Sequence, residues 1–143
     1  MQARMTQILS TVVVLALAAA FAGCGDVDSN DDVQDDGPVV SEQGLFEAHV
    51  TPDPAKPSTG DNTLMLHIMD MDGNGVEGLT LDVEPWMPHH GHGSPEEPVV
   101  MEKDNGMYMV ENVVYSMPGR WEVRIDVDDG EVSDRFVLKY SVQ

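Results

Sequence analysis

Residues 120–142, RWEVRIDVDDGEVSDRFVLKYSV, decide the fold. Apolar and polar side chains alternate on both sides of Asp129-Gly130. The apolar positions are Trp121, Val123, Ile125 and Val127 before that dipeptide, and Phe136, Leu138, Tyr140 and Val142 after it. A period of two is typical of a half-buried strand, and Asp-Gly between two such runs is a strong hairpin signal. The stretch therefore predicts an antiparallel β-hairpin.

The same alternation continues upstream. Further strands are predicted around Phe46-Ala48-Val50, Leu64-Leu66-Ile68 and Leu79-Leu81-Val83, and at 99–103 and 107–114, which Asn105-Gly106 joins. Seven short antiparallel strands in the 100 residues from Gly44 to Gln143 predict an all-β, immunoglobulin-like β-sandwich. No long segment has helical periodicity, so folds built from βαβ units are excluded.

The first 23 residues have the build of an export signal. Arg4 precedes an apolar run at 8–22, and small residues precede Cys24, the only cysteine. Phe21-Ala22-Gly23-Cys24 looks like a bacterial lipobox, so we expect residues 1–23 to be a signal peptide and Cys24 to carry lipid. The alternative is an ordinary cleaved signal with an incidental cysteine. A membrane-spanning anchor is disfavoured because the run is shorter than the roughly 20 residues needed.

Residues 24–43 carry many acids and no base, so we expect an acidic disordered tether ahead of the domain at 44–143. The chain has 26 acidic residues and 7 Lys or Arg, one of which is Arg4 in the signal, so the mature protein would carry 26 − 6, a net charge of −20. Such a charge disfavours nucleic acid and anionic membrane surfaces as partners. A cationic ligand is the electrostatically favoured partner, although the charge also serves solubility.

Three of the five histidines lie in Trp86-Met87-Pro88-His89-His90-Gly91-His92-Gly93-Ser94. Pro88 and the glycines exclude a helix, so the segment is predicted to be a loop. Imidazole and thioether together suit copper, and short histidine-rich tracts commonly bind metal. The candidate ligands are Met87, His89, His90 and His92. The alternative is a solvated connecting loop.

Strand alternation predicts a row of methionine side chains on one face of the strand around Leu64-Leu66-Ile68. If Leu64, Leu66 and Ile68 share one face, then Met65, His67, Met69 and Met71 share the other, and Met107 and Met109 repeat the pattern. Core packing is the favoured interpretation for most of these methionines, because methionine fills gaps in cores. His67 is the exception and a further candidate ligand, since a buried histidine needs a polar partner or a ligand. His49 is expected on the surface.

The sequence indicates neither a calcium-binding EF-hand nor a catalytic site. Residues 70–75, DMDGNG, imitate the start of an EF-hand loop, but position twelve is Leu81 where a bidentate glutamate is required. A tight hairpin turn explains the same residues. No nucleophile elbow, phosphate-cradling loop or activated cysteine is present, so we expect a protein that is not an enzyme.

The order of motifs along the domain resembles the YtkA-like family, which is related to FixH-like proteins. The motifs are Pro57-x-x-Gly60-x-Asn62-x-Leu64, Asp70-x-Asp72-Gly73-x-Gly75-Val76-x-Gly78, Trp86-Met87-Pro88-x-His90-Gly91-His92-Gly93, Gly106-x-Tyr108 and Met117-Pro118-Gly119-x-Trp121-x-Val123. In the family's Met-Pro-x-x-Gly-His-Gly pattern, Met87, Pro88, Gly91, His92 and Gly93 match, His90 occupies a position where methionine or histidine is common, and His89 is extra.

The resemblance implies a small exported or membrane-anchored β-sandwich, often a lipoprotein, sometimes found alongside copper-handling or respiratory-oxidase assembly functions. FixH-like members carry an N-terminal membrane helix, whereas this chain has a lipobox and a tether. We therefore expect a lipid-anchored extracytoplasmic protein, on the outer membrane if the cell has two membranes, that buffers or passes on a metal, with copper preferred. Its partners would be the membrane, through the anchor, and copper-handling or respiratory-complex proteins. The alternative is an immunoglobulin-like interaction module without metal.

Overall fold

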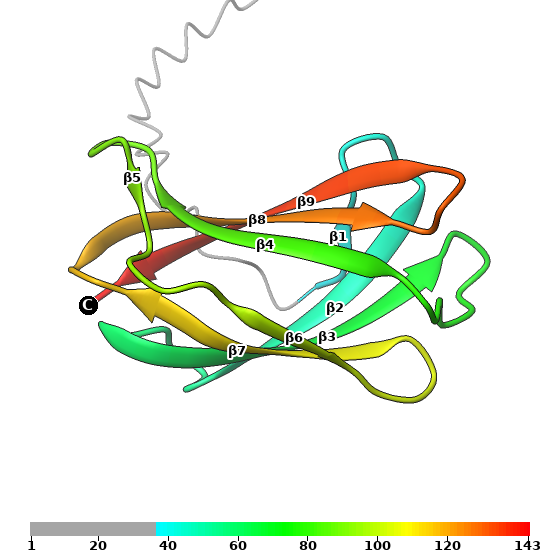
Figure 1. Ribbon diagram of the computed structural model, residues 1–143, viewed down its shortest axis with the longest axis horizontal. Coiled ribbons are helices and arrows are strands. Elements are labelled where there is room, and N and C mark those ends of the chain that lie inside the picture. Colours follow the sequence, from blue (N-terminus) through cyan, green and yellow to red (C-terminus); the bar gives the residue numbers. More distant parts are fainter. Residues whose placement is uncertain (1–36) are drawn as a thin grey trace, which may run out of the picture.

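The computed structural model describes residues 37–143, which fold into two antiparallel β-sheets packed face to face (Figure 1). The strands are β1 (Val39–Val40), β2 (Phe46–Asp53), β3 (Gly60–Asp70), β4 (Thr80–Met87), β5 (His92–Gly93), β6 (Val99–Glu102), β7 (Met107–Tyr115), β8 (Gly119–Asp128) and β9 (Ser133–Val142). The first sheet has the order β1-β2-β3-β7-β6, and the second has the order β5-β4-β8-β9. Within 37–143, no helix is long and apolar enough to cross a membrane.

The prediction of an all-β sandwich of antiparallel strands is confirmed, with nine strands in place of the expected seven. The seven longer strands, β2 to β4 and β6 to β9, coincide with the seven alternating segments of the sequence. The structure adds β1 and β5, which have two residues each and lie at sheet edges. Strands this short have no readable periodicity, and for that reason the sequence pattern missed them.

The hydrophobic core fills the space between the inner faces of the two sheets. Leu64, Leu66 and Ile68 contribute from β3, and alternate residues of β8 and β9 contribute from the other sheet. Trp121, at 1% exposure, is the largest fully buried side chain. Its ring centroid lies 5.3 Å from that of Tyr115. Each sheet therefore has one dry face and one face toward solvent.

Both predicted hairpins are present. Residues 129–132 join β8 to β9, and Asn105-Gly106, both at positive φ, lie in the turn between β6 and β7. Residues 70–75 form a tight turn, in which the Asp70 carboxylate accepts hydrogen bonds from the backbone amides of Asp72 and Asn74. The hydrogen bonds from Asn74 and these amides lower the pKa of Asp70. The EF-hand-like residues therefore serve a turn.

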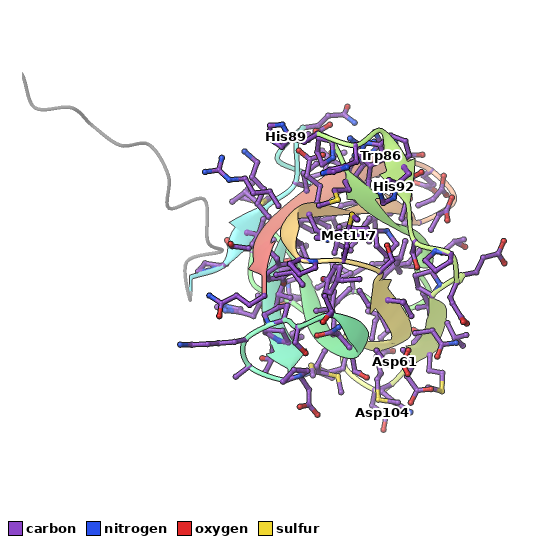
Figure 2. The ribbon with its side chains drawn as sticks, turned by 90° about the vertical axis from the view of Figure 1, so that its left-hand side faces the viewer. Asp61, Trp86, His89, His92, Asp104 and Met117 are labelled. Atoms are coloured by element: carbon purple, nitrogen blue, oxygen red, sulfur yellow. The ribbon has the colours of Figure 1, made fainter. Side chains whose placement is uncertain are left out.

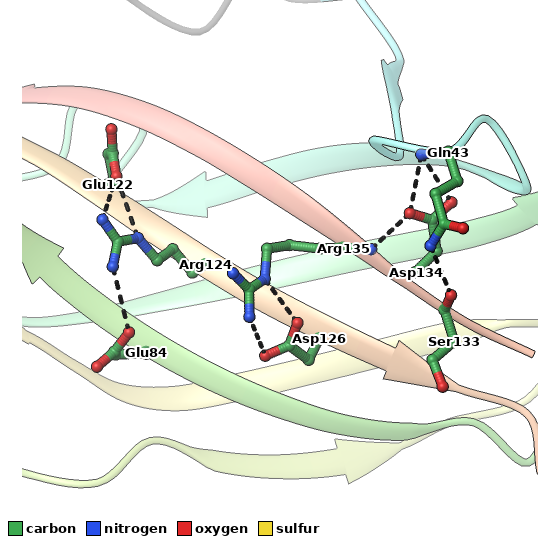
Figure 3. A network of polar contacts seen from close by, with 8 residues as sticks. All are labelled: Gln43, Glu84, Glu122, Arg124, Asp126, Ser133, Asp134 and Arg135. Carbon is green, nitrogen blue, oxygen red and sulfur yellow. Dashed lines mark hydrogen bonds and ion pairs between the residues drawn. The ribbon is translucent and has the colours of Figure 1, made fainter.

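The ordered sandwich begins before Gly44. Val39 and Val40 pair with β2, and the backbone amides of Gln43 and Leu45 donate to the carboxylate of Asp134 on β9 at 3.0 and 3.2 Å (Figure 3). Residues 39–43, which the sequence analysis assigned to the tether, therefore belong to the ordered sandwich. Composition alone could not predict this, because it does not reveal the hydrogen bonds that hold these residues. The predicted signal peptide, Cys24 and the start of the tether lie outside the described residues.

Replacing Asp134 with alanine should destabilise the domain at neutral pH. Asp134 is only 4% exposed, and its loss leaves the amides of Gln43 and Leu45 without their acceptor, a cost of about 1–3 kcal/mol. Chemical denaturation of Asp134→Ala and of the exposed-site control Asp104→Ala measures the difference. Equal stabilities of the two variants would contradict this account of the N-terminal segment.

The effect of Asp134 should also depend on pH. Burial alone would raise the pKa of Asp134, but hydrogen bonds from Ser41 and from the amides of Gln43, Arg135 and Leu45 lower it overall. A carboxylate with a lowered pKa stabilises the fold above its unfolded-state pKa of about 3.9, and this contribution is lost as pH falls through the folded-state value. The stability gap between wild type and Asp134→Ala should therefore narrow in acid. A difference in stability that grows in acid would contradict a lowered pKa for Asp134.

Candidate metal centre

The histidine-rich segment is a tight hairpin rather than an open loop. β4 extends to Met87, the amides of His90 and Gly91 donate to the Met87 carbonyl at 3.1 and 2.9 Å, and the chain then returns as β5. In this hairpin Trp86 lies opposite Gly93, and Met87 lies opposite His92. Because opposite residues of an antiparallel pair share a face, Met87 and His92 lie on the same side.

His92 occupies the inner side of the hairpin and is half-buried. Its ring packs edge-on against Trp121, with 5.9 Å between the centroids. Its Nδ1 lies 3.1 Å from the backbone carbonyl oxygen of Gly93. The tautomer that donates from Nδ1 to this carbonyl leaves a lone pair on Nε2, as in most metal-binding histidines. His92 is therefore held in an orientation and a tautomer suited to binding a metal through Nε2.

His90 is exposed, and its ring is the nearest imidazole to that of His92. The two centroids are 5.8 Å apart and the planes are inclined by 63°. Metal–imidazole bonds are about 2.0–2.1 Å and the ring centroid lies about 1 Å further on, so two imidazoles that share an ion have centroids roughly 5–6 Å apart. The observed spacing falls in that range.

Met87 supplies the third group at this place. Its side chain is 2% exposed, it lies opposite His92, and its methyl occupies the space that a Cβ on Gly119 would need. Directly opposite residues have Cβ atoms about 4.5–5.5 Å apart, so the Met87 side chain leaves the backbone beside that of His92 and continues into the hydrophobic core. The hairpin therefore carries two imidazoles and one thioether.

Two predicted ligands lie elsewhere. His89 is exposed and is drawn apart from His92, to its left, in Figure 2. His67 belongs to β3, in the other sheet. Among residues 37–143, no group of three or more His, Cys, Asp or Glu side chains is placed to hold a metal ion. A metal site at the hairpin would therefore need a ligand other than a third histidine beside His90 and His92.

Two further residues at this end bear on the site. Met117 precedes β8, is 36% exposed, and accepts a 3.0 Å hydrogen bond from Trp121 Nε1 through its carbonyl oxygen (Figure 2). The sequence analysis did not name Met117 as a candidate ligand, although Met117-Pro118-Gly119 is one of the motifs quoted above. Trp86 lies on the outer face of the second sheet, where the Arg124 guanidinium stacks 5.2 Å from its ring centroid.

The family model named YtkA-like matches residues 41–126, which contain Met87, His90 and His92. The chain belongs to the YtkA-like family. This confirms the resemblance drawn from the motifs. A solved structure similar to this YtkA-like chain is a DUF4426 family protein from Pseudomonas aeruginosa PAO1, with 14% identity, a TM-score of 0.49 and coverage of 68% of this chain and 90% of that chain. No functionally curated protein matches the sequence.

Proposed function

We propose that this YtkA-like domain is a lipid-anchored extracytoplasmic protein that binds copper and passes it on or buffers it. The hairpin ligands would be His90, His92 and Met87, with Met117 as a further donor from the neighbouring turn. The observation that carries the proposal is the placement of His92, which contacts the His90 ring, lies opposite Met87, and has Nδ1 directed to a backbone carbonyl. A histidine in a solvated connecting loop would need neither these two neighbours nor this orientation of its ring.

The donor set favours copper over zinc. Thioether sulfur is a soft ligand that selects copper, whereas zinc sites use thiolate, imidazole and carboxylate. The only cysteine is Cys24, which the lipobox assigns to lipid attachment. The net charge of −19 for the whole chain supports the proposal, because it attracts cations.

A transfer or buffering role fits the exposure gradient of the site. Met87 is buried, His92 is half-buried and His90 is exposed. An ion held by His90 and His92 would lie near the surface, within reach of a partner protein's ligands, with Met87 on its buried side. The absence of a nucleophile or activated base in the sequence motifs supports binding rather than catalysis.

Copper binding should weaken in mild acid. Metal binding through imidazole requires the deprotonated ring nitrogen, so protons compete with copper and the affinity should fall steadily as the solution is acidified below neutral pH. Competition titration of the full-length chain with Cu(I), Cu(II) and Zn(II) against chelators of known affinity measures this. An affinity that stays flat with pH would contradict ligation by histidine. Weak binding of all three metals would instead favour the interaction module without metal.

A further inference from the structure

Five of the chain's ten methionines lie on the outer face of the first sheet. We call this surface the methionine face; it consists of Met65, Met69, Met101, Met107 and Met109 with His49 and His67. The five methionines and His67 are partly buried, and none of them belongs to the core between the sheets. The expectation that most of these methionines pack in the core is therefore wrong, because the sheet directs the opposite parity of β3 and β7 inward.

Strand register arranges these side chains in rows across the sheet. Met65 on β3 lies opposite Met109 on β7, and Met109 lies opposite Met101 on β6. In the adjacent row, His67 lies opposite His49 on one side and Met107 on the other. Opposite residues have Cβ atoms about 5 Å apart. Successive rows on one strand are about 7 Å apart. Three thioethers therefore stand side by side, with an imidazole in the next row.

The outer face of the second sheet has different chemistry. There the Arg135 guanidinium pairs with Asp126 at 2.6 Å, and Arg124 pairs with Glu122 at 2.9 Å (Figure 3). Charged pairs are an ordinary way to cover the solvent-facing side of a sheet. The same fold thus has one charged outer face and one sulfur-rich outer face. Neither solubility nor strand propensity explains the methionines on the outer face of the first sheet, because methionine is not among the residues that strands prefer.

His67 is the second observation that points to a ligand. Its Nε2 is buried and has no hydrogen-bond partner among the described residues. A buried polar atom without a partner is costly, and in native structures it calls for an explanation such as an ion. The groups that face His67 across the sheet are His49, which is exposed, and Met107. An ion accepted by Nε2 would have thioethers as its nearest additional ligands.

We propose that the methionine face holds a second metal site, for a soft monovalent ion such as Cu(I), formed by the sulfurs of Met65, Met107 and Met109 with Nε2 of His67. Thioether ligands select Cu(I). The flexible methionine side chain, with three rotatable bonds, lets sulfurs from adjacent strands converge on one ion above the sheet. The site lies on the sheet that does not contain the β4–β5 hairpin. The inference therefore goes beyond the proposed function, and the two can fail separately.

Silver(I) titration of the full-length chain tests the second site, because Ag(I) is soft and monovalent and does not change oxidation state under these conditions. The double variant Met65→Leu, Met109→Leu removes two sulfurs while keeping apolar volume. We expect it to lose one equivalent of Ag(I) and to keep the binding of the hairpin. Met71→Leu is the matched control, because Met71 is 57% exposed and lies in the turn after β3. Unchanged stoichiometry and affinity in the double variant would overturn the proposal.

A second measurement keeps the proposal testable if the double variant folds poorly. In the unmutated protein with ¹³C-labelled methionine methyl groups, Ag(I) should shift the signals of Met65, Met107 and Met109 and leave Met71 unchanged. Shifts confined to Met87 and Met117 would place soft-ion binding at the hairpin only and would overturn the second site. Shifts at the methionine face in a His90→Ala variant would support the second site even if the hairpin binds no metal.

Discussion

Gly106→Ala should destabilise the domain by about 2–4 kcal/mol, the largest stability effect of a small substitution that we expect here. Gly106 has φ of 73°, and a Cβ there would lie 2.6 Å from the carbonyl oxygen of Ile68 and 2.7 Å from the amide nitrogen of Val76. Both atoms are backbone atoms, and they hydrogen-bond to each other at 2.9 Å, so neither can move aside cheaply. Urea denaturation measures the loss.

Gly78→Ala is the matched control for this prediction. Gly78 has φ of 75°, but a Cβ there would meet nothing within 4 Å. The control therefore isolates the cost of a left-handed backbone, about 1–2 kcal/mol, from the cost of the close approach at Gly106. Equal destabilisation by the two variants would show that the packing of the β6–β7 turn against β3 is looser than described.

Loss of His92 should weaken copper binding by at least about 100-fold, because even a residue that only supports a ligand typically contributes 10–100-fold. His90→Ala should also weaken binding, and because His90 is exposed this variant should fold normally.

Met87→Leu keeps the buried volume and removes the sulfur, so it should lower Cu(I) affinity more than Zn(II) affinity. Chelator competition on each full-length variant gives these affinities.

His89→Ala is the matched control for the hairpin variants. It removes an imidazole from the same hairpin, at an exposed position apart from His92 (Figure 2). We expect its copper affinity to equal that of the wild type. If His89→Ala and His90→Ala weakened binding equally, the histidines would act as an unstructured cluster, and the geometry described for His90, His92 and Met87 would not be the binding site.

The strands could be predicted from the sequence because each carries its own evidence. Trp121 to Val127 alternates strictly, and Asp129-Gly130 marks the turn that follows, so both hairpin strands were placed within two residues. Alternation on both sides of the turn residues Asn105-Gly106 predicted β6 and β7 in the same way. It did not predict β1, because a strand of two residues shows no alternation, although its partner β2 follows directly along the chain.

The candidate site was only partly predictable. Composition identified the segment that contains Met87, His90 and His92, but the pairing of Met87 with His92 depends on where β4 ends, and that follows from packing against β8. His67 was singled out correctly as unusual, yet alternation alone cannot tell which face of β3 meets the other sheet. The row from Met65 to Met101 required the register across three strands, information that no single segment contains.

The most direct test of the central claim is ¹⁵N NMR of the imidazole side chains in the full-length chain, before and after one equivalent of Cu(I). The account predicts that Nε2 of His90 and of His92 shifts to values typical of metal-bound nitrogen, that Nδ1 of His92 stays protonated toward the Gly93 carbonyl, and that His89 does not change. Copper that leaves both His90 and His92 unshifted, or that shifts His89 to the same extent, would contradict it.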